Sequence, residues 1–483
     1  MTMGKVGSGD TANPPGTGWA SRAPGRQAGS GQTSARFSGG LFLGALALLP
    51  ARLISAGRGL GLTSDDALVV TSCGGEATMA LSADILLRAA REYGTPLFVY
   101  DADLMLQRYR ELHEFINWPK LRIFYAMKAN YSVALLRTLH EAGAALDTVS
   151  PGEVLLAQRL GYPADRILYT ANSMTDAEVR DVQRSGVLMN IGELSRLEKF
   201  GREFPGSRVC VRFNPDVVDG ETASTATAGP ATKFGILMQD VGQVVALAAR
   251  YRLTVVGLHE HTGSGLTQEA SVYQSMANLM SLATPERFPH LEFLDFGGGF
   301  KVPYRPDEKR VDYRAMGAEI ARLFRGFCTG YGRELEMRFE PGKCIVAECG
   351  HLVVEVNTLK DNRGRLIAGC NSGFPQLIRP MLYNAYHQIV NLSHPQGPTR
   401  LYDVCGNICE TGDRFAELRE LPEIREGDLL DIQNAGAYCY SMGGIYNLRP
   451  MPTEIRVRAG HLNLARRALS NEQMVEQILS ESV

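Results

Sequence analysis

The sequence predicts an α/β fold, a (β/α)8 barrel of the TIM type in which parallel strands alternate with helices. Apolar runs of strand length recur from about residue 95 onward, and amphipathic stretches of helix length separate them. There are eight such units, the number that closes a barrel. We therefore expect an active site at the carboxyl ends of the strands.

The elements can be assigned in order along the chain. The helical stretches include VALLRTLHEAG, EVLLAQRLG, ELSRLEKFGREF and YRAMGAEIARLFRGF, in which apolar residues recur at helical spacing. The predicted strands are residues 122–128, 145–149, 167–171, 187–191, 208–214, 253–261, 291–296 and 334–340.

Composition narrows the class of protein. The chain has 483 residues, 45% of them hydrophobic and 21% charged, which suits a globular protein of two domains. Its formal net charge of −2 favours a small-molecule substrate over nucleic acid or a membrane. The nine cysteines show neither disulfide-scaffold nor zinc spacing. They indicate a reduced, cytoplasmic protein.

Residues 1–62 differ from the rest of the chain. They are rich in Gly, Ser, Pro, Ala and Arg, a composition that cannot bury a core. The apolar run Leu41–Ile54 is short for a membrane span and is broken by Pro50. We predict a disordered extension or a leader that is not part of the working protein. An amphipathic or targeting role, including that of a transit peptide, is the alternative.

Lys128 ends the first predicted strand, FYAMKAN, which otherwise reads as buried. An ammonium group in apolar surroundings either reaches water or loses its proton more easily. A neutral amine is a nucleophile towards aldehydes. The plainer interpretation is a lysine that marks where the strand leaves the core.

Further candidate residues follow the ends of later strands. A lysine for an imine, a glycine loop for a phosphate, an acid and a stacking imidazole are what pyridoxal phosphate requires. A third metal ligand at suitable spacing does not accompany the two histidines, so we predict no metal. The residues are His259, His261 and Ser264 after the sixth strand, Gly297, Gly298 and Gly299 after the seventh, and Glu340, Gly342 and Lys343 after the eighth.

Six motifs in this order carry a resemblance to a known family: YAMKAN, HEHTGSG, DFGGGF, EPGK, CGNICETGD and GAYCYSM, the last followed by YNLRP. From about residue 70 to 458 the chain resembles the alanine-racemase-like, fold type III decarboxylases that use pyridoxal phosphate, and within them most closely the diaminopimelate decarboxylases. The resemblance implies a C-terminal β domain after the barrel. It also implies a homodimer in which each subunit completes the other's active site.

The resemblance and the patterns together give a domain plan. Short β-like runs such as HLVVEVNTLK, RLIAGC and RLYDVCG follow Gly350 and agree with a β domain. We expect an N-terminal segment that joins the β domain, the cofactor-binding barrel, the β domain itself and a C-terminal tail. Their predicted ranges are 63–94, 95–345, 346–460 and 461–483.

The resemblance also implies roles for single residues toward the cofactor. Lys128 is the Schiff-base lysine, and Glu340 holds a proton on the pyridine nitrogen. His261 stacks on the ring, and Asp147 and Arg212 lie beside the cofactor. The remaining cofactor-binding residues are Ser264, Gly297, Gly298, Gly299, Gly342, Lys343 and Tyr438, several of them at the phosphate.

Toward the substrate, the resemblance makes Arg379 and Tyr383 the pair that binds a carboxylate, with Lys343 and Tyr438 beside them. A planar guanidinium suits a carboxylate through two parallel hydrogen bonds. Cys409 protonates the carbanion, and Glu410 contacts substrate amino groups.

The implied activity is decarboxylation of meso-2,6-diaminopimelate to L-lysine and carbon dioxide, the last step of lysine biosynthesis. Two departures bear on specificity. Lys343 stands where the family usually has arginine, and residues 219–236 keep the KFGI ending but lack, in their first half, the His and Lys common in relatives. Decarboxylation of ornithine, arginine or carboxynorspermidine is the alternative, and Glu410 directly after the cysteine favours diaminopimelate. A non-catalytic binding relative is the third possibility, and the presence of Lys128, Glu340 and Cys409 together argues against it.

Overall fold

A computed structural model of the chain describes residues 81–220, 227–230, 232–266 and 268–482. The extension predicted at residues 1–62 lies outside this part of the chain. Within it, the helices are too short or too polar for any of them to cross a membrane.

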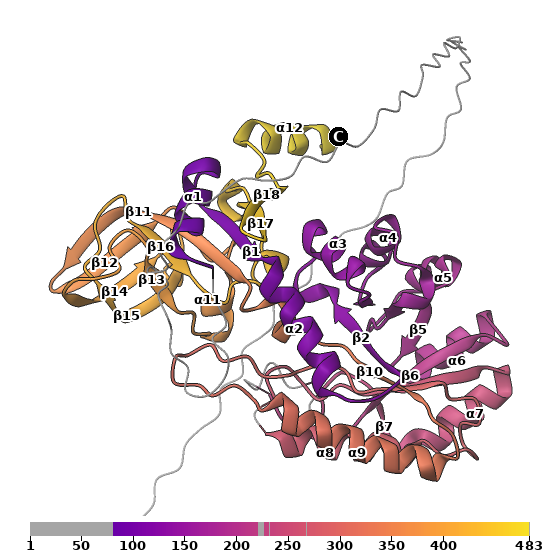
Figure 1. Ribbon diagram of the computed structural model, residues 1–483. Coiled ribbons are helices and arrows are strands. Elements are labelled where there is room, and N and C mark those ends of the chain that lie inside the picture. Colours follow the sequence, from indigo (N-terminus) through magenta and orange to yellow (C-terminus); the bar gives the residue numbers. More distant parts are fainter. Residues whose placement is uncertain (1–80, 221–226, 231, 267, 483) are drawn as a thin grey trace, which may run out of the picture. The chain divides into compact units, whose positions relative to one another are not determined.

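Eight parallel strands form a closed barrel, as the sequence predicted (Figure 1). Each strand pairs with the next, and β10 pairs with β2 to close the barrel. The short β7, Ile236–Leu237, pairs with β6. All eight predicted strands are confirmed. They are β2 (Leu121–Ala126), β3 (Ala145–Thr148), β4 (Ile167–Tyr169), β5 (Leu188–Ile191), β6 (Arg208–Asn214), β8 (Thr254–His259), β9 (Phe293–Asp295) and β10 (Glu336–Phe339).

Helices connect the barrel strands and cover them outside. Helix α9, Tyr313–Tyr331, shows how the sequence sets their ends: the Asp312 side chain accepts hydrogen bonds from the first turn, and Gly332 ends the helix with a φ of 86°. Its Phe324 packs edge-on against Trp118 at 5.1 Å. The other barrel helices are α2 (Ala102–Phe115), α3 (Val133–Glu141), α4 (Pro151–Arg159), α5 (Asp176–Ser185), α6 (Leu194–Glu203), α7 (Val241–Tyr251) and α8 (Glu269–Leu282).

The barrel interior is filled toward the amino ends of the strands. Phe124 and Phe293 belong to a buried cluster with residues of neighbouring strands. The Arg338 guanidinium lies 3.4 Å from the Phe293 ring centroid. A Cβ at Gly257 would come within 2.0 Å of the same ring, so only glycine fits there. These side chains fill the interior at this level of the described barrel.

A second sheet, the predicted C-terminal β domain, follows the barrel. Its main path runs β15-β14-β12-β11-β1-β17-β18, with β16 attached to β11 and β13 attached to β16. The strands are β11 (Gly350–Asn362), β12 (Arg365–Cys370), β13 (Ile389–Asn391), β14 (Thr399–Cys405), β15 (Arg414–Pro422), β16 (Leu429–Ile432), β17 (Thr453–Arg458) and β18 (His461–Arg466). Short helices α10 (Lys343–Val346) and α11 (Arg379–Tyr383) precede and interrupt it, and α12 (Asn471–Glu481) follows it.

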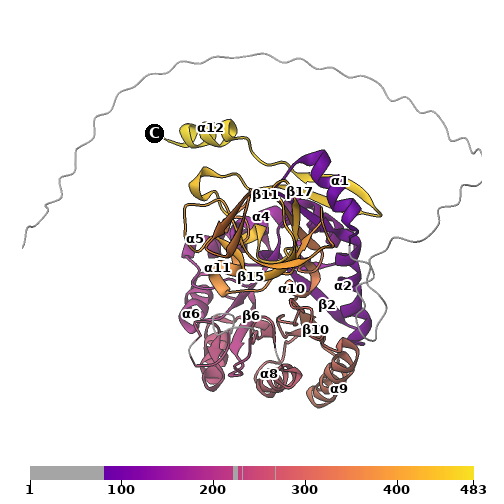
Figure 2. The ribbon, with the colours of Figure 1, turned by 90° about the vertical axis from the view of Figure 1, so that its left-hand side faces the viewer.

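The sheet also takes in chain from before the barrel. Strand β1, Leu97–Asp101, pairs antiparallel with β11 and parallel with β17. Figure 2 shows these two strands near helix α1, Ala83–Tyr93, which precedes β1. The boundary predicted at residue 95 thus falls before β1, and β18 extends the sheet past the end predicted at residue 460.

Candidate active site

One pocket at the carboxyl ends of the barrel strands gathers eight of the predicted residues. Tyr438 comes from the second sheet's domain, and its backbone N–H donates to the Ala129 carbonyl at 2.8 Å. The Asn130 side chain donates to the Gly436 carbonyl at 2.9 Å. These bonds fix the β-domain segment beside the barrel rim. The eight are Lys128, His261, Ser264, Gly299, Glu340, Gly342, Lys343 and Tyr438.

Lys128 lies on a 3-10 turn, Met127–Ala129, just after β2 and not within the strand itself. Its Nζ forms an ion pair with Oδ2 of Asp147, whose side chain is fully buried. Burial lowers the pKa of Lys128, but the charges of Asp147, Tyr438 and Glu340 outweigh it, and the pKa is raised. Of the two outcomes considered for this lysine, reaching water or losing its proton more easily, the raised pKa does not favour the second.

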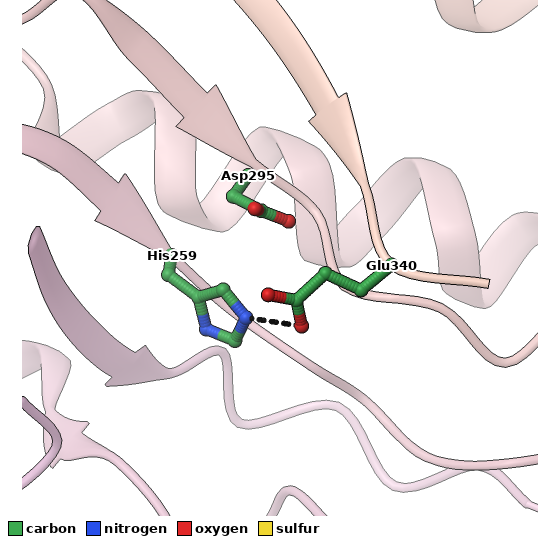
Figure 3. A group of neighbouring side chains, drawn as sticks. All are labelled: His259, Asp295 and Glu340. Carbon is green, nitrogen blue, oxygen red and sulfur yellow. Dashed lines mark hydrogen bonds and ion pairs between the residues drawn. The ribbon is translucent and has the colours of Figure 1, made fainter. Parts of the chain in front are cut away.

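Glu340 is held by residues from two other strands. His259 Nε2 lies 2.9 Å from Glu340 Oε2, and the Thr170 hydroxyl donates to Oε1 at 3.4 Å. Figure 3 shows His259 and Glu340 turned toward each other at the ends of their strands. Because a carboxylate only accepts, His259 carries its proton on Nε2. Both oxygens of Glu340 thus have a donor.

The same view shows Asp295 above this pair. The ligand atoms of His259, Asp295 and Glu340 all lie within 4.8 Å of one another. The two histidines, for which the sequence predicted no metal, have different partners. His259 is hydrogen-bonded to Glu340, whereas His261 Nδ1 accepts the Gly298 N–H at 3.1 Å. The acids that accompany His259 come from strands far along the chain, so spacing in the sequence missed them.

Burial sets the charges of these groups. It lowers the pKa of His259 and of His261 well below the ordinary value, and the charge of Arg212 lowers both further, so both rings are neutral. Burial raises the pKa of Glu340, while Lys128 and Arg212 oppose the rise. The positive charges of Lys128 and Arg212 thus favour the ionised form of Glu340 against its burial.

The glycine loop serves packing as much as binding. A Cβ at Gly298 would lie 2.4 Å from the Glu340 carbonyl oxygen, and one at Gly299 would lie 2.2 Å from the Gly263 oxygen. The N–H of Gly297 donates to Asp295 Oδ1 at 3.0 Å. With the Gly298 N–H given to His261, Gly299 is the glycine of the three that lines the pocket. Of the three glycines expected at the phosphate, Gly297 and Gly298 are therefore not among the residues that line the described pocket.

Several buried polar atoms of the rim have no hydrogen-bond partner within the described protein: Oδ1 of Asp147, Nη2 of Arg212 and Nδ1 of His259. Unpaired polar atoms are costly to bury, so such a cluster indicates a polar ligand. Pyridoxal phosphate, expected from the sequence, would bring a phosphate, a ring nitrogen and a phenolic oxygen to this lysine-bearing pocket. The residues present fit it.

Arg379 is not among the residues that line the pocket, but it lies against Tyr304, a residue that sequence reasoning missed and that also lies near the pocket residue Lys343. Its guanidinium lies 4.3 Å from the Tyr304 ring centroid, and the Lys343 Nζ lies 5.9 Å from the same centroid. Arg379 is buried, with 3% of its surface exposed. Tyr304 stands in VPYRP, directly after the glycine loop, and this position is the signal that was available. Tyr383, half-buried, ends the same short helix as Arg379.

Cys409 and Glu410 are exposed and line no pocket described within this single chain. Their loop is shaped by Asp413, which accepts the Ile408 N–H at 2.8 Å and the Phe374 N–H at 2.6 Å. A buried carboxylate with several backbone donors fixes a loop firmly. The predicted roles of Cys409 and Glu410 stay predictions.

Comparisons with known proteins point to one family. The family model described as the pyridoxal binding domain of pyridoxal-dependent decarboxylases matches residues 103–347. The diaminopimelate decarboxylase of Methanothermobacter thermautotrophicus is 39% identical over 388 residues, which are 78% of this chain and 90% of that protein. The diaminopimelate decarboxylase of Escherichia coli strain K12 is 32% identical, over 83% of this chain and 96% of its own length.

Solved structures agree. A crystal structure of diaminopimelate decarboxylase superposes with a TM-score of 0.77 at 31% identity and covers 83% of this chain and 98% of its own. That of the Helicobacter pylori diaminopimelate decarboxylase, complexed with L-lysine, has a TM-score of 0.76 at 26% identity and covers 82% and 100%.

Proposed function

The chain belongs to the pyridoxal-dependent decarboxylase family, and from that premise we propose that it decarboxylates meso-2,6-diaminopimelate to L-lysine and carbon dioxide, the last step of lysine biosynthesis. One observation carries the proposal: Lys128, Glu340 and Tyr438, from three motifs far apart in the chain, line one pocket. The buried Arg379 lies against Tyr304, which also lies near the pocket residue Lys343. The similarity to diaminopimelate decarboxylases over four-fifths of the chain supports this substrate.

The cofactor is pyridoxal phosphate, which when bound supplies a ring that takes up the electrons left by departing carbon dioxide. Lys128 would hold it covalently. Ser264, Gly299 and Tyr438 would hold its phosphate, and His261 would lie against its ring.

Two carboxylates would handle protons. Asp147, paired with Lys128, accepts the proton that the ammonium group must lose before its nitrogen becomes a nucleophile. Glu340, oriented by His259 and Thr170, would hold a proton at the ring nitrogen. Its negative charge there stabilises the electron-poor form of the ring.

Positively charged side chains would hold the substrate. Arg379, with Tyr383, would bind a carboxylate of the substrate through two parallel hydrogen bonds. Lys343, where relatives usually carry arginine, would act as a single positive charge without a forked contact.

We further propose that the protein is a homodimer. Cys409 would donate a proton to the substrate carbon in the partner's pocket, and Glu410 would contact a substrate amino group there. Their exposure on a loop shaped by Asp413 supports such a contact. A cytoplasmic location is supported by the eight free cysteines of the described residues.

The test is to incubate the purified protein and pyridoxal phosphate with diaminopimelate, ornithine, arginine and carboxynorspermidine, and to measure carbon dioxide and the amine product. We expect turnover of meso-diaminopimelate to lysine. Preference for another of these amino acids would overturn the substrate, and absence of any turnover would favour a binding role. Lys128→Ala should be inactive, and Lys120→Ala, at an exposed lysine, should match wild type.

A further inference from the structure

We propose that His387 is a positioning residue that holds the Arg379 guanidinium in the orientation that binds a substrate carboxylate. This inference rests on the proposed function, in which Arg379 binds that carboxylate. His387 is fully buried in the segment between α11 and β13 and is not among the residues that line the described pocket. It would act through the arginine and not on the substrate.

The two ring nitrogens of His387 have different partners, which fix its tautomer. Nδ1 lies 2.8 Å from the Gln433 carbonyl oxygen, which only accepts, so Nδ1 carries the hydrogen. Nε2 lies 3.0 Å from Arg379 Nη1 and is therefore the acceptor of an N–H from the guanidinium. An arginine always donates, so the pair has one consistent arrangement.

The arrangement persists over the working pH range. Burial and the charge of Arg379 lower the pKa of His387 to about 3. The ring therefore stays neutral, and Nε2 keeps its lone pair for Arg379 at any pH near neutrality.

Tyr304 supplies the second support. The Arg379 guanidinium lies 4.3 Å from its ring centroid, and the His387 ring meets it nearly edge-on at 5.5 Å and 79°. Arg379 is thus held at Nη1 by an acceptor and on its face by an aromatic ring. Fixing a flexible side chain before the ligand arrives lowers the entropy cost of binding.

Two substitutions test the roles of the two ring nitrogens of His387 separately. His387→Asn keeps a donor for the Gln433 carbonyl but removes the acceptor for Arg379, while His387→Gln reaches further and restores an acceptor oxygen. We expect His387→Asn to raise KM for the diacid substrate on the order of tenfold with kcat little changed. His387→Gln should bring KM back close to wild type.

His351 provides a matched control, because it is buried in the same sheet domain and pairs with Asp431 at 2.9 Å instead of an active-site group. His351→Asn should lower the melting temperature and leave KM unchanged. If His387 had a purely structural role, His387→Asn would likewise lower the melting temperature and leave KM unchanged.

A double-mutant cycle decides the matter. In an Arg379→Gln background, His387→Asn should have no further effect on KM, because its effect passes through Arg379. The same rise in KM in both backgrounds, or an unchanged KM in His387→Asn alone, would overturn the proposal. Should His387→Asn not fold, a tenfold rise of KM in His387→Gln would overturn it equally.

Failure of the proposed function shows separately, in the wild type. If wild type prefers another carboxylate-bearing amino acid, the substrate assignment falls and the cycle is measured with that amino acid. If wild type turns nothing over, the cycle is measured as the Kd of meso-diaminopimelate by calorimetry, with the same expected factors. Wild type that binds no carboxylate would overturn both proposals.

Discussion

The pocket at the barrel rim and the loop that carries Cys409 differ in how completely a single chain supplies their contacts. At the rim, Asp147 and Glu340 are 0% and 6% exposed and have named partners within the chain. Cys409 and Glu410 are exposed, although Asp413 fixes the loop that presents them. Buried groups owe their charge and orientation to their own chain, whereas exposed groups on a shaped loop need a second surface before they act.

The largest effect is expected at the centre of the rim. Lys128→Ala should abolish covalent binding of cofactor and lower activity more than about a thousandfold, because the covalent bond is assigned to Lys128, whereas Lys343, the other lysine that lines the described pocket, is assigned to the substrate. Borohydride reduction followed by peptide mapping should find the cofactor on the Lys128 peptide of wild type. Label on a different peptide would contradict the assignment.

The next effect concerns the acid held by His259. Glu340→Gln should lower kcat on the order of a hundredfold or more, because a neutral amide cannot stabilise a proton at the ring nitrogen. The thermal melting curve should stay cooperative. Glu334→Gln, at an exposed glutamate just before the same strand, is the matched control and should leave kcat unchanged. Equal turnover in the two variants would remove Glu340 from the mechanism.

Mixed dimers test the role of the loop that carries Cys409. If Cys409 acts in the partner's pocket, Lys128→Ala and Cys409→Ala are defects in opposite halves of one site, and a mixed dimer has one site with both defects and one with neither. Random exchange of equal amounts should restore about a quarter of wild-type activity, since half of the dimers are mixed and each has one good site of two.

Mass spectrometry should confirm that subunits have exchanged. Activity that stays at the level of the separate variants despite exchange would place Cys409 in its own chain's site or remove it from the reaction.

The smallest expected effect is on the pH dependence of stability, and it is tested by comparing the buried Glu260 with the exposed Glu410. Glu260, between the two histidines, is buried, and burial raises its pKa to about 7, although the Ser275 and Thr262 hydroxyls and Arg212 oppose the rise. The folded state therefore binds this proton more tightly than the unfolded state. Its contribution to stability is complete below the unfolded pKa of about 4.5 and is lost as pH rises to about 7, by about 1.4 kcal/mol per pH unit at most.

Glu260→Gln should remove this part of the pH dependence, which urea unfolding between pH 4.5 and 7.5 would measure. Its amide oxygen can still accept the Ser275 hydroxyl, which now donates at 2.7 Å. Glu410→Gln, on the exposed loop, should leave the pH profile of stability as in wild type. Parallel profiles for wild type and Glu260→Gln would show that Glu260 is not the titrating group.

Much of the site followed from local sequence. Lys128, Glu340 and the glycines stand directly after strand-length apolar runs, and residues in such places meet at one rim of a barrel. The motifs at Arg379 and Cys409 offered no such rule, since neither follows a barrel strand, and only their resemblance to a family gave them roles. Tyr304, His387 and Asp413 were missed because each acts through contacts that the sequence pattern does not show: Tyr304 with Arg379 far along the chain, His387 with Arg379 eight residues before it, and Asp413 with backbone N–H groups of its own loop and of Phe374.

By itself, the sequence determined the eight barrel strands, the β domain after them and the positions of the rim residues, because hydrophobic periodicity and chain order act locally. Only the tertiary structure decided that β1 joins the second sheet, because a short apolar strand suits several partners. It also decided that Lys128 pairs with Asp147 and that His259 is hydrogen-bonded to Glu340. Those outcomes depend on which charges lie within a few ångströms in a buried site, and distance in space is not written in the order of residues.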